Sequence, residues 1–305
     1  MTKKNKKKSL KHFNPIDMGG VLKGDMELSD VGENFGFFSR GSREKLFLSK
    51  YSEKDLLGVM EQVGLVKHLK GRGFDTLVVE VGIDESDVHQ LRVYADKKSY
   101  DSVLIDLKLS ESRFVPDPKF LEEKSGIVTL DMVVIEWLSI SNPRADFSGT
   151  KPQLPGQERP GLGGLGYFMK MMYHVAEGVT KDGFMDVPDH MHGAVMYSKN
   201  FKFFNPSHEA VLRAIMRDLG KHSLSDISWG MITGTVIDKS TRTPQVYDPS
   251  EQIFPVSSRI NNYFKSKKYT RKFDEVYRKK SYYLDMEAML TRRAEILKKK
   301  DPADL

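Results

Sequence analysis

The stretch Leu154-Pro-Gly-Gln-Glu-Arg-Pro-Gly-Leu-Gly-Gly-Leu-Gly166 lies between the most apolar segment of the chain and an amphipathic one. Glycine lets the backbone come close to a ligand, and the first N–H groups of a following helix have no partner within that helix. Such amides, together with the positive end of the helix dipole, bind phosphate groups. The stretch therefore predicts an anion-binding loop; the alternative is a flexible surface loop before a helix.

The segments before the loop predict mainly strands. Short segments rich in β-branched residues at 76–83, 88–95 and 102–109 are typical of strands, the first two joined by a turn at 84–87. Residues 129–140 (TLDMVVIEWLSI) are the most apolar segment, and we expect them to form the central strand. Upstream, residues 45–49 predict a strand. Ser52 and Asp55 predict the start of a helix that ends near Gly71.

The segments after the loop alternate between helix and strand. Apolar residues at helical spacing predict a helix over residues 165–178. We then expect a strand at 184–187, a helix at 189–199, a strand at 201–204, helices at 207–219, 257–264 and 272–299, and irregular structure or a β-hairpin at 233–254. This order predicts an α/β protein with a mixed, largely antiparallel central sheet flanked by helices. The expected divisions are a basic irregular arm at 1–44, a ligand-binding domain at 45–206 and a helical C-terminal extension at 207–305.

Charge and cysteine content narrow the class of protein. The chain has 305 residues, no cysteine and a net charge of +6. Residues 1–12 hold six lysines and no acid, residues 265–300 hold 13 Lys+Arg against 5 Asp+Glu, and residues 301–305 hold two Asp, so residues 13–264 carry a net −6. An acidic body with basic ends is not the basic face that nucleic acid requires, so we expect no nucleic-acid partner. We also expect no disulfide, no transmembrane helix, no signal peptide and a cytoplasmic location.

The glycine spacings of the loop are close to those of two nucleotide-binding motifs. A phosphate-binding Walker A loop requires Lys and Ser or Thr where Leu162 and Gly163 stand. The dinucleotide motif G-x-G-x-x-G is met by Gly161, Gly163 and Gly166, and Asp186 follows 20 residues after the last glycine. That motif needs its first glycine directly after a strand, whereas about twenty residues separate residue 140 from Gly161. An NAD-type oxidoreductase is therefore kept as an alternative.

A segment further along carries a family resemblance. It reads His190-Met-His-Gly-Ala-Val-Met-Tyr-Ser-Lys-Asn-Phe-Lys-Phe203. With the preceding strands and the glycine loop, residues 45–204 resemble the GNAT superfamily of acyl-CoA N-acyltransferases, and Ala194, Tyr197 and Phe201 match its pattern on the helix and strand after the loop. His190 stands where the family has Asn, and Asn200 where it has Gly. The resemblance is to a divergent member.

The resemblance implies a cofactor, acetyl-CoA or another acyl-CoA, held by the loop residues Gln157, Arg159, Gly161, Leu162, Gly163, Gly164 and Gly166. The pantetheine arm would pass between the strand ending at residue 140 and the strand at 184–187. Tyr197 would be the general acid; the alternative is a tyrosine packed on a helix face. Glu136, the one carboxylate in the apolar run after Asp131, is the expected base; the alternative is a solvated strand face.

The expected activity is transfer of an acetyl group to an amine of a small molecule or a protein. A catalytically inactive GNAT-fold binding module is the second alternative. The acidic body favours a cationic acceptor. His190 and His192 are two residues apart and could carry a proton, but we expect no metal site. The sequence does not determine the oligomeric state.

Overall fold

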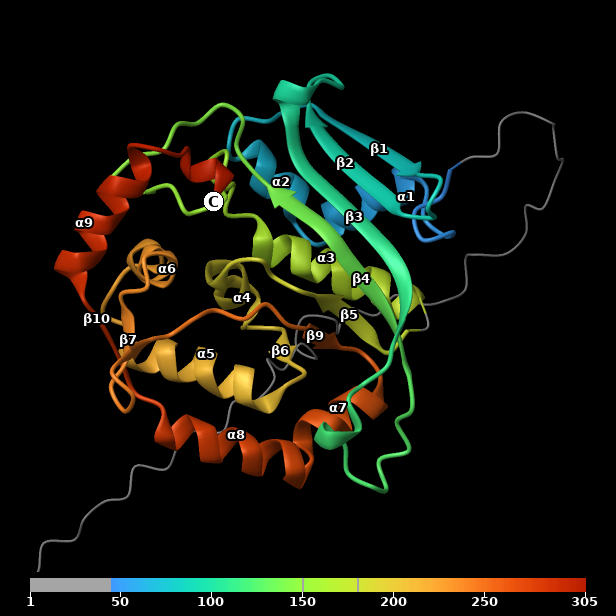
Figure 1. The fold of residues 1–305 in the computed structure, drawn as a ribbon. Coiled ribbons are helices and arrows are strands. Elements are labelled where there is room, and N and C mark those ends of the chain that lie inside the picture. Colours follow the sequence, from blue (N-terminus) through green and yellow to red (C-terminus); the bar gives the residue numbers. More distant parts are fainter. Residues whose placement is uncertain (1–44, 150, 180) are drawn as a thin grey trace, which may run out of the picture. The chain divides into compact units, whose positions relative to one another are not determined.

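The central sheet is mixed and mostly antiparallel, as the sequence predicts (Figure 1). The computed structural model describes residues 45–149, 151–179 and 181–305, so the expected arm at 1–44 lies outside the described residues. Within them, seven strands pair in the order β1-β2-β3-β4-β5-β9-β6. Their bounds are β1 Leu77–Ile83, β2 His89–Ala95, β3 Val103–Phe114, β4 Leu130–Ile140, β5 Gly183–Asp186, β6 Lys202–Phe203 and β9 Gln252–Pro255. The predicted central strand, β4, is the middle strand of the seven.

Four helices belong to the predicted ligand-binding domain at 45–206, and further helices follow it in the sequence. The first group is α1 Glu53–Gln62, α2 Leu65–Lys70, α3 Leu165–Gly178 and α4 Met191–Tyr197. The second group is α5 Pro206–Asp218, α6 Leu224–Ile232, α7 Ser258–Lys265, α8 Lys267–Lys279 and α9 Met286–Leu297. Among the described residues, every helix is too short or too polar to cross a bilayer.

Local signals place the first helices. Ser52 and Asp55 form the predicted capping box, in which each side chain bonds the backbone N–H of the other residue. The predicted single helix is divided at Gly64, whose φ of 82° lies in the left-handed region that glycine adopts readily. The expected strand at 45–49 forms only one isolated bridge, between Phe47 and Tyr51.

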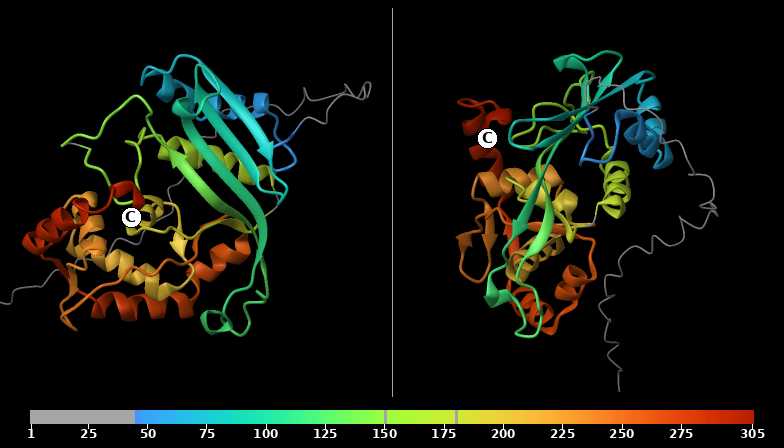
Figure 2. Two further views of the ribbon diagram at one scale, coloured as in Figure 1. Left: turned by 45° about the horizontal axis from the view of Figure 1, so that its top comes forward. Right: turned by 90° about the vertical axis from the view of Figure 1, so that its right-hand side faces the viewer.

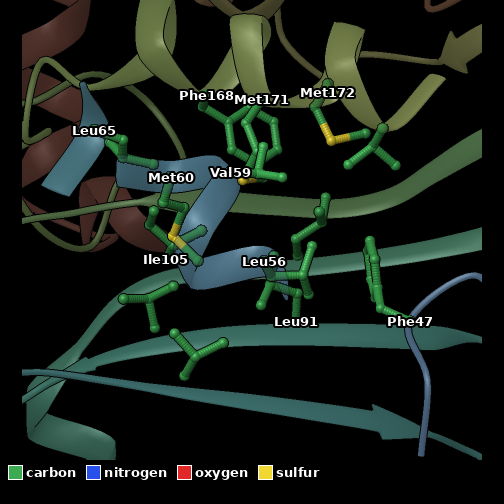
Figure 3. Packing of buried hydrophobic residues seen from close by; sticks show 14 of the residues in the cluster. Phe47, Leu56, Val59, Met60, Leu65, Leu91, Ile105, Phe168, Met171 and Met172 are labelled. Atoms are coloured by element: carbon green, nitrogen blue, oxygen red, sulfur yellow. The ribbon is translucent and has the colours of Figure 1, made fainter. Parts of the chain in front are cut away.

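The main core lies between helices α1–α3 and one face of the sheet. Figure 2 shows these three helices on the same side of β1–β4. Figure 3 shows how their apolar side chains meet the sheet, with Leu56 and Met60 of α1, Phe168 and Met171 of α3, and Leu91 and Ile105 of the strands fully buried. Burial of each such side chain stabilises the fold by about 1.5–3 kcal/mol. This core holds α3, and therefore the loop before it, against β4.

On the opposite face, residues from the second half of the chain cover the part of the sheet around β9 and β6. Tyr263 of α7 donates a hydrogen bond to the Phe204 carbonyl at 2.7 Å, and Tyr269 of α8 donates to the Phe203 carbonyl at 2.9 Å. Both tyrosines are buried in a cluster with Ile253 of β9. The two hydroxyl groups thus satisfy backbone carbonyls at the end of β6.

Three features after residue 206 differ from expectation. The predicted helix at 272–299 is wrong: α8 ends at Lys279, and β10 (Tyr282–Leu284) pairs with β7 (Val236–Asp238) before α9 begins. With β8 (Thr243–Pro244) these strands form a second, three-stranded sheet. Helix α6 has no predicted counterpart. Finally, β9 pairs with both β5 and β6, so residues on both sides of position 206 build the central sheet.

Candidate functional site

Strands β4 and β5 run parallel and then part. They pair only where Met132, Val133 and Val134 meet β5, and β5 ends at Asp186. β4 continues to Ile140, and no described strand pairs with it on this side between Val134 and Ser141. The Ile140 carbonyl points to this side, because it accepts a hydrogen bond from Leu162. By the two-residue period of a strand, the backbone groups of Leu138 point the same way. An open strand edge therefore lies beside the end of β5.

A β-bulge accounts for the parting. In the β3–β4 register, Lys108 opposes Trp137 but Leu109 opposes Ile135, so Glu136 is an extra residue in β4. A bulge bends its strand and increases the local twist. Because Glu136 comes two residues after the last pair with β5, the bend turns β4 away from β5 at this point.

The glycine loop closes the far end of this open edge. Gly161 forms an isolated antiparallel bridge with Ser141, in which the Asn142 amide donates to the Pro160 carbonyl at 2.7 Å and the Leu162 amide to the Ile140 carbonyl at 3.4 Å. The next four amides donate to no group in the described part of the chain; they belong to Gly163, which precedes α3, and to Gly164, Leu165 and Gly166 at its start. The structure thus holds four free N–H groups at the positive end of a helix.

Arg72 lies against this loop and was not predicted as a site residue. Gly163 has a φ of 70°, and a Cβ added there would lie 3.6 Å from Arg72 Nη2. Arg72 is exposed, and its guanidinium forms no hydrogen bond or ion pair with any described residue. A free guanidinium beside free amides suits a phosphate group. Arg72 precedes the loop by about 90 residues, so no local pattern links the two.

His68 orders the same loop from α2. Its Nε2 lies 3.1 Å from the Leu162 carbonyl oxygen, and its ring packs against Tyr167 with centroids 4.9 Å apart. A Cβ at Gly164 would meet the side chains of His68 and Ile140 at ordinary contact distance. The loop is therefore held by α2 on one side and by β4 on the other.

The two predicted side chains before Gly161 have other partners in the structure. Gln157 Oε1 accepts a hydrogen bond from the Leu154 amide at 3.2 Å. Arg159 forms an ion pair with the exposed Asp101 at 3.2 Å and lies over the Tyr100 ring. Both residues shape the segment that leads into the glycine loop.

Tyr197 lies near Asp186, the last residue of β5. Burial, and then the charge of Asp186, raises the pKa of Tyr197 well above its usual value. Burial, together with the nearby charge of Asp189, raises the pKa of Asp186 to about 7. The Tyr197 ring packs on Phe201 with centroids 5.1 Å apart, and its hydroxyl group forms no hydrogen bond with a described residue. Tyr197 therefore keeps its proton near neutral pH, while Asp186 can gain or lose one.

Glu136 is not brought to Tyr197. Its exposed carboxylate accepts a hydrogen bond from Ser110 of β3, which is the neighbour of β4 on the side away from β5. Asp186 occupies the place near Tyr197 that was expected for Glu136. The sequence contains one signal for Asp186, because this residue is an acid at the end of the strand that follows α3. The signal was interpreted as the acid of the dinucleotide motif and not as a base for acyl transfer.

The two histidines at the start of α4 are packed against other elements. Their rings stack with centroids 5.3 Å apart, and His192 Nδ1 lies 3.0 Å from Ser228 Oγ. Burial lowers the pKa of His192 to about 4, so this ring is neutral near pH 7. His190 packs so close to Gly156 that a side chain there would displace it. The described residues contain no group of three His, Asp or Glu side chains that could hold a metal ion.

A pocket of about 310 Å³ borders the loop on the side of α6. One of its lining residues, Lys151, is charged; the others are Phe147, Pro152, Leu154, Gln157, Pro160, Gly161, Ser223, Leu224 and Ser225. The pocket contains no carboxylate, so it does not provide the negative surface that would attract a cationic acceptor.

Comparison with known proteins gives no match among family models, curated proteins or solved structures. The class of the protein therefore rests on its own geometry.

Proposed function

We propose that this protein is an acyl-CoA-dependent N-acyltransferase of the GNAT type, which transfers an acetyl group to an amine. The observation that carries the proposal is the open edge of β4, which runs from its parting with β5 to the four free amides at the start of α3. An extended chain with amide groups could pair with the open edge of β4, as a strand would. A diphosphate at the other end of that chain would meet the α3 amides and Arg72. The pantetheine arm and diphosphate of coenzyme A have this combination of groups.

The residues near the end of β5 suit the proton transfers of such a reaction. When bound, acetyl-CoA supplies the acetyl group as a thioester. The Asp186 carboxylate takes one proton from the acceptor ammonium, and the nitrogen lone pair then forms the C–N bond. As the C–S bond breaks, the Tyr197 hydroxyl gives its proton to the sulfur and regains one from the nitrogen. Asp186 finally releases its proton to solvent. Tyr197 is thus the proposed general acid, as the resemblance implies, and Asp186 replaces Glu136 as the proposed base.

The NAD-type oxidoreductase has less support. Dinucleotide-binding folds use a parallel sheet with the glycine turn directly after a strand. In the described sheet, β4 and β5 are the one parallel pair, and Gly161 follows a long connection from β4. No specific observation favours this activity over acyl transfer.

Calorimetric titration with acetyl-CoA and, separately, with NADH tests the proposal. We expect binding of acetyl-CoA and none of NADH.

Gly166 provides a sharper probe, because it is exposed and a Cβ there meets no atom within 4 Å. Gly166→Asp places a negative charge beside the amides and should weaken acetyl-CoA binding by at least about tenfold.

The same substitution should not harm the fold. An acidic side chain in the first turn of a helix stabilises it by about 0.3–1 kcal/mol. Gly166→Asp is therefore expected to be as stable as the wild type or more so, and Gly166→Ala is the matched control that should retain affinity. Binding of NADH without acetyl-CoA, or undiminished acetyl-CoA affinity in Gly166→Asp, would refute the proposed site.

A further inference from the structure

A buried glutamine lies beside Asp186 on the neighbouring strand. β9 runs antiparallel to β5, and Gln252 stands directly opposite Asp186 in their register. Directly opposed residues of an antiparallel pair project from the same face, with Cβ atoms about 5 Å apart. The carboxamide of Gln252 and the carboxyl group of Asp186 are therefore neighbours on the face that α4 covers.

The carboxamide of Gln252 is only half satisfied by hydrogen bonds. Its Nε2 donates to the Ala194 carbonyl of α4 at 3.1 Å. Its Oε1 is buried and has no hydrogen-bond partner among the described residues, and the side chain as a whole is 0% exposed. Buried acceptors of this kind are nearly always paired in folded proteins. A donor is therefore expected next to Oε1.

Two residues stand opposite Gln252 on the neighbouring strands, and only one of them can supply that donor. β9 lies between β5 and β6, and the residue opposite Gln252 on β6 is Phe203, whose side chain is apolar. The residue opposite on β5 is Asp186. An ionised carboxylate can only accept hydrogen bonds, whereas a protonated carboxyl group donates one. Of the two neighbours, only Asp186 in its protonated form provides a donor.

The groups around Asp186 favour that protonated form. Burial opposes ionisation, and the negative charge of Asp189 opposes it further, whereas the Val187 amide favours the carboxylate. The hydroxyl groups of Tyr197 on α4 and Tyr247 before β9 also interact with Asp186. No lysine or arginine in the described part of the chain forms an ion pair with Asp186. The protonated carboxyl group is therefore populated near neutral pH.

We infer that the protonated carboxyl group of Asp186 donates a hydrogen bond to Oε1 of Gln252, which makes Gln252 the positioning residue for this carboxyl group. The same carboxamide holds α4 through Ala194, so one side chain fixes Asp186 relative to the helix that carries Tyr197. The importance of this arrangement for acetyl transfer rests on the proposed function, but the hydrogen bond itself does not.

Nuclear magnetic resonance of the wild-type protein with labelled Asp and Gln side chains tests the bond directly. One Asp carboxyl signal should titrate near pH 7 and be missing from Asp186→Asn. The carboxamide signals of Gln252, assigned by their loss in Gln252→Met, should shift with the same midpoint, because Oε1 loses its donor when Asp186 ionises. Gln252 signals that stay constant through the Asp186 titration would overturn the inference.

Gln252→Met gives a second, independent measurement. Methionine has a similar volume but offers no amide oxygen, so the protonated form loses its acceptor and the Asp186 midpoint should fall by about one pH unit. If Gln252 accepted no hydrogen bond from Asp186, the more apolar methionine would only make the carboxylate of Asp186 harder to ionise, and the midpoint would rise instead. Gln90→Met is the matched control, since Gln90 is a strand glutamine bonded to Asp106, and it should leave the Asp186 midpoint unchanged. Neither measurement requires turnover, so failure of this inference is distinct from failure of the proposed function.

Discussion

At the scale of single residues, burial sets the charge state of Asp186 and links it to the stability of the fold. Its pKa of about 7 in the folded protein lies above the value near 3.9 of an unfolded chain. The folded state therefore binds more protons than the unfolded state between these values. Stability contributed by this group is greatest below pH 4, falls as the pH rises, and is fully lost above pH 7.

Removal of this charge should stabilise the protein in alkaline solution. Asp186→Asn is expected to raise the free energy of unfolding at pH 8 by about 2–4 kcal/mol and to change it little at pH 4. Urea titrations at the two pH values measure this difference. Asp131→Asn, at an exposed carboxylate 3.5 Å from Arg113, should change stability by less than about 0.5 kcal/mol at both. An Asp186→Asn variant no more stable than the wild type at pH 8 would contradict the assigned charge state.

Tyr197 can be tested without disturbing its packing. Tyr197→Phe keeps the ring contact with Phe201 and removes only the hydroxyl group. Acetyl transfer should slow by about 10²-fold or more, with acetyl-CoA affinity unchanged. Steady-state kinetics and calorimetry measure the two effects, and Tyr283→Phe at an exposed position is the control. Transfer at the wild-type rate would remove Tyr197 from the mechanism.

At the scale of elements, two glycines six residues apart have different roles. Gly58 lies within α1, and Gly64 lies between α1 and α2. Gly64 has a φ of 82° between α1 and α2, and an added Cβ would lie 3.5 Å from Tyr167. Gly58 is exposed within α1, and an added Cβ there would meet no atom within 4 Å.

Alanine at these two glycines should therefore have opposite effects. Gly64→Ala is expected to destabilise the protein by about 1 kcal/mol, because alanine is strained at that backbone conformation. Gly58→Ala should stabilise it by about 0.5–1 kcal/mol through helix propensity. Thermal and urea unfolding measure both. The same sign for both variants would argue against the division between α1 and α2.

Elements with a local signal could be predicted from the sequence, whereas those made by distant pairing could not. The capping box of α1 and the turn at 84–87 depend on residues a few positions apart, and both are confirmed. β10 interrupts the predicted helix at 272–299 because it pairs with β7, more than forty residues earlier. The same holds for the candidate site. The glycine loop and Tyr197 carry local patterns, but Arg72 and Gln252 reach the site only through the fold.

At the scale of the whole molecule, the sheet depends on residues far apart in the sequence. β9 occupies the position between β5 and β6, and the described residues all belong to one compact unit. A chain ending at residue 206 would lose β9 and leave β5 and β6 without their shared neighbour.

We therefore expect residues 1–206 alone not to fold. Their amide proton spectrum should show narrow dispersion, and urea should produce no cooperative transition, in contrast to the full chain. A cooperative transition of the shorter chain would show that β9 is dispensable for the sheet. This outcome would also weaken the placement of Gln252 beside Asp186.

The late position of β9 also affects how the protein is made. Gln252 follows Asp186 by 66 residues, and ribosomes add about 5–20 residues per second, so roughly 3–13 seconds pass between synthesis of β5 and synthesis of its partner. During that interval the outer edge of β5 has no strand to pair with, and such edges readily join other nascent chains. Protection by chaperones on crowded polysomes should matter most for this protein between these two strands.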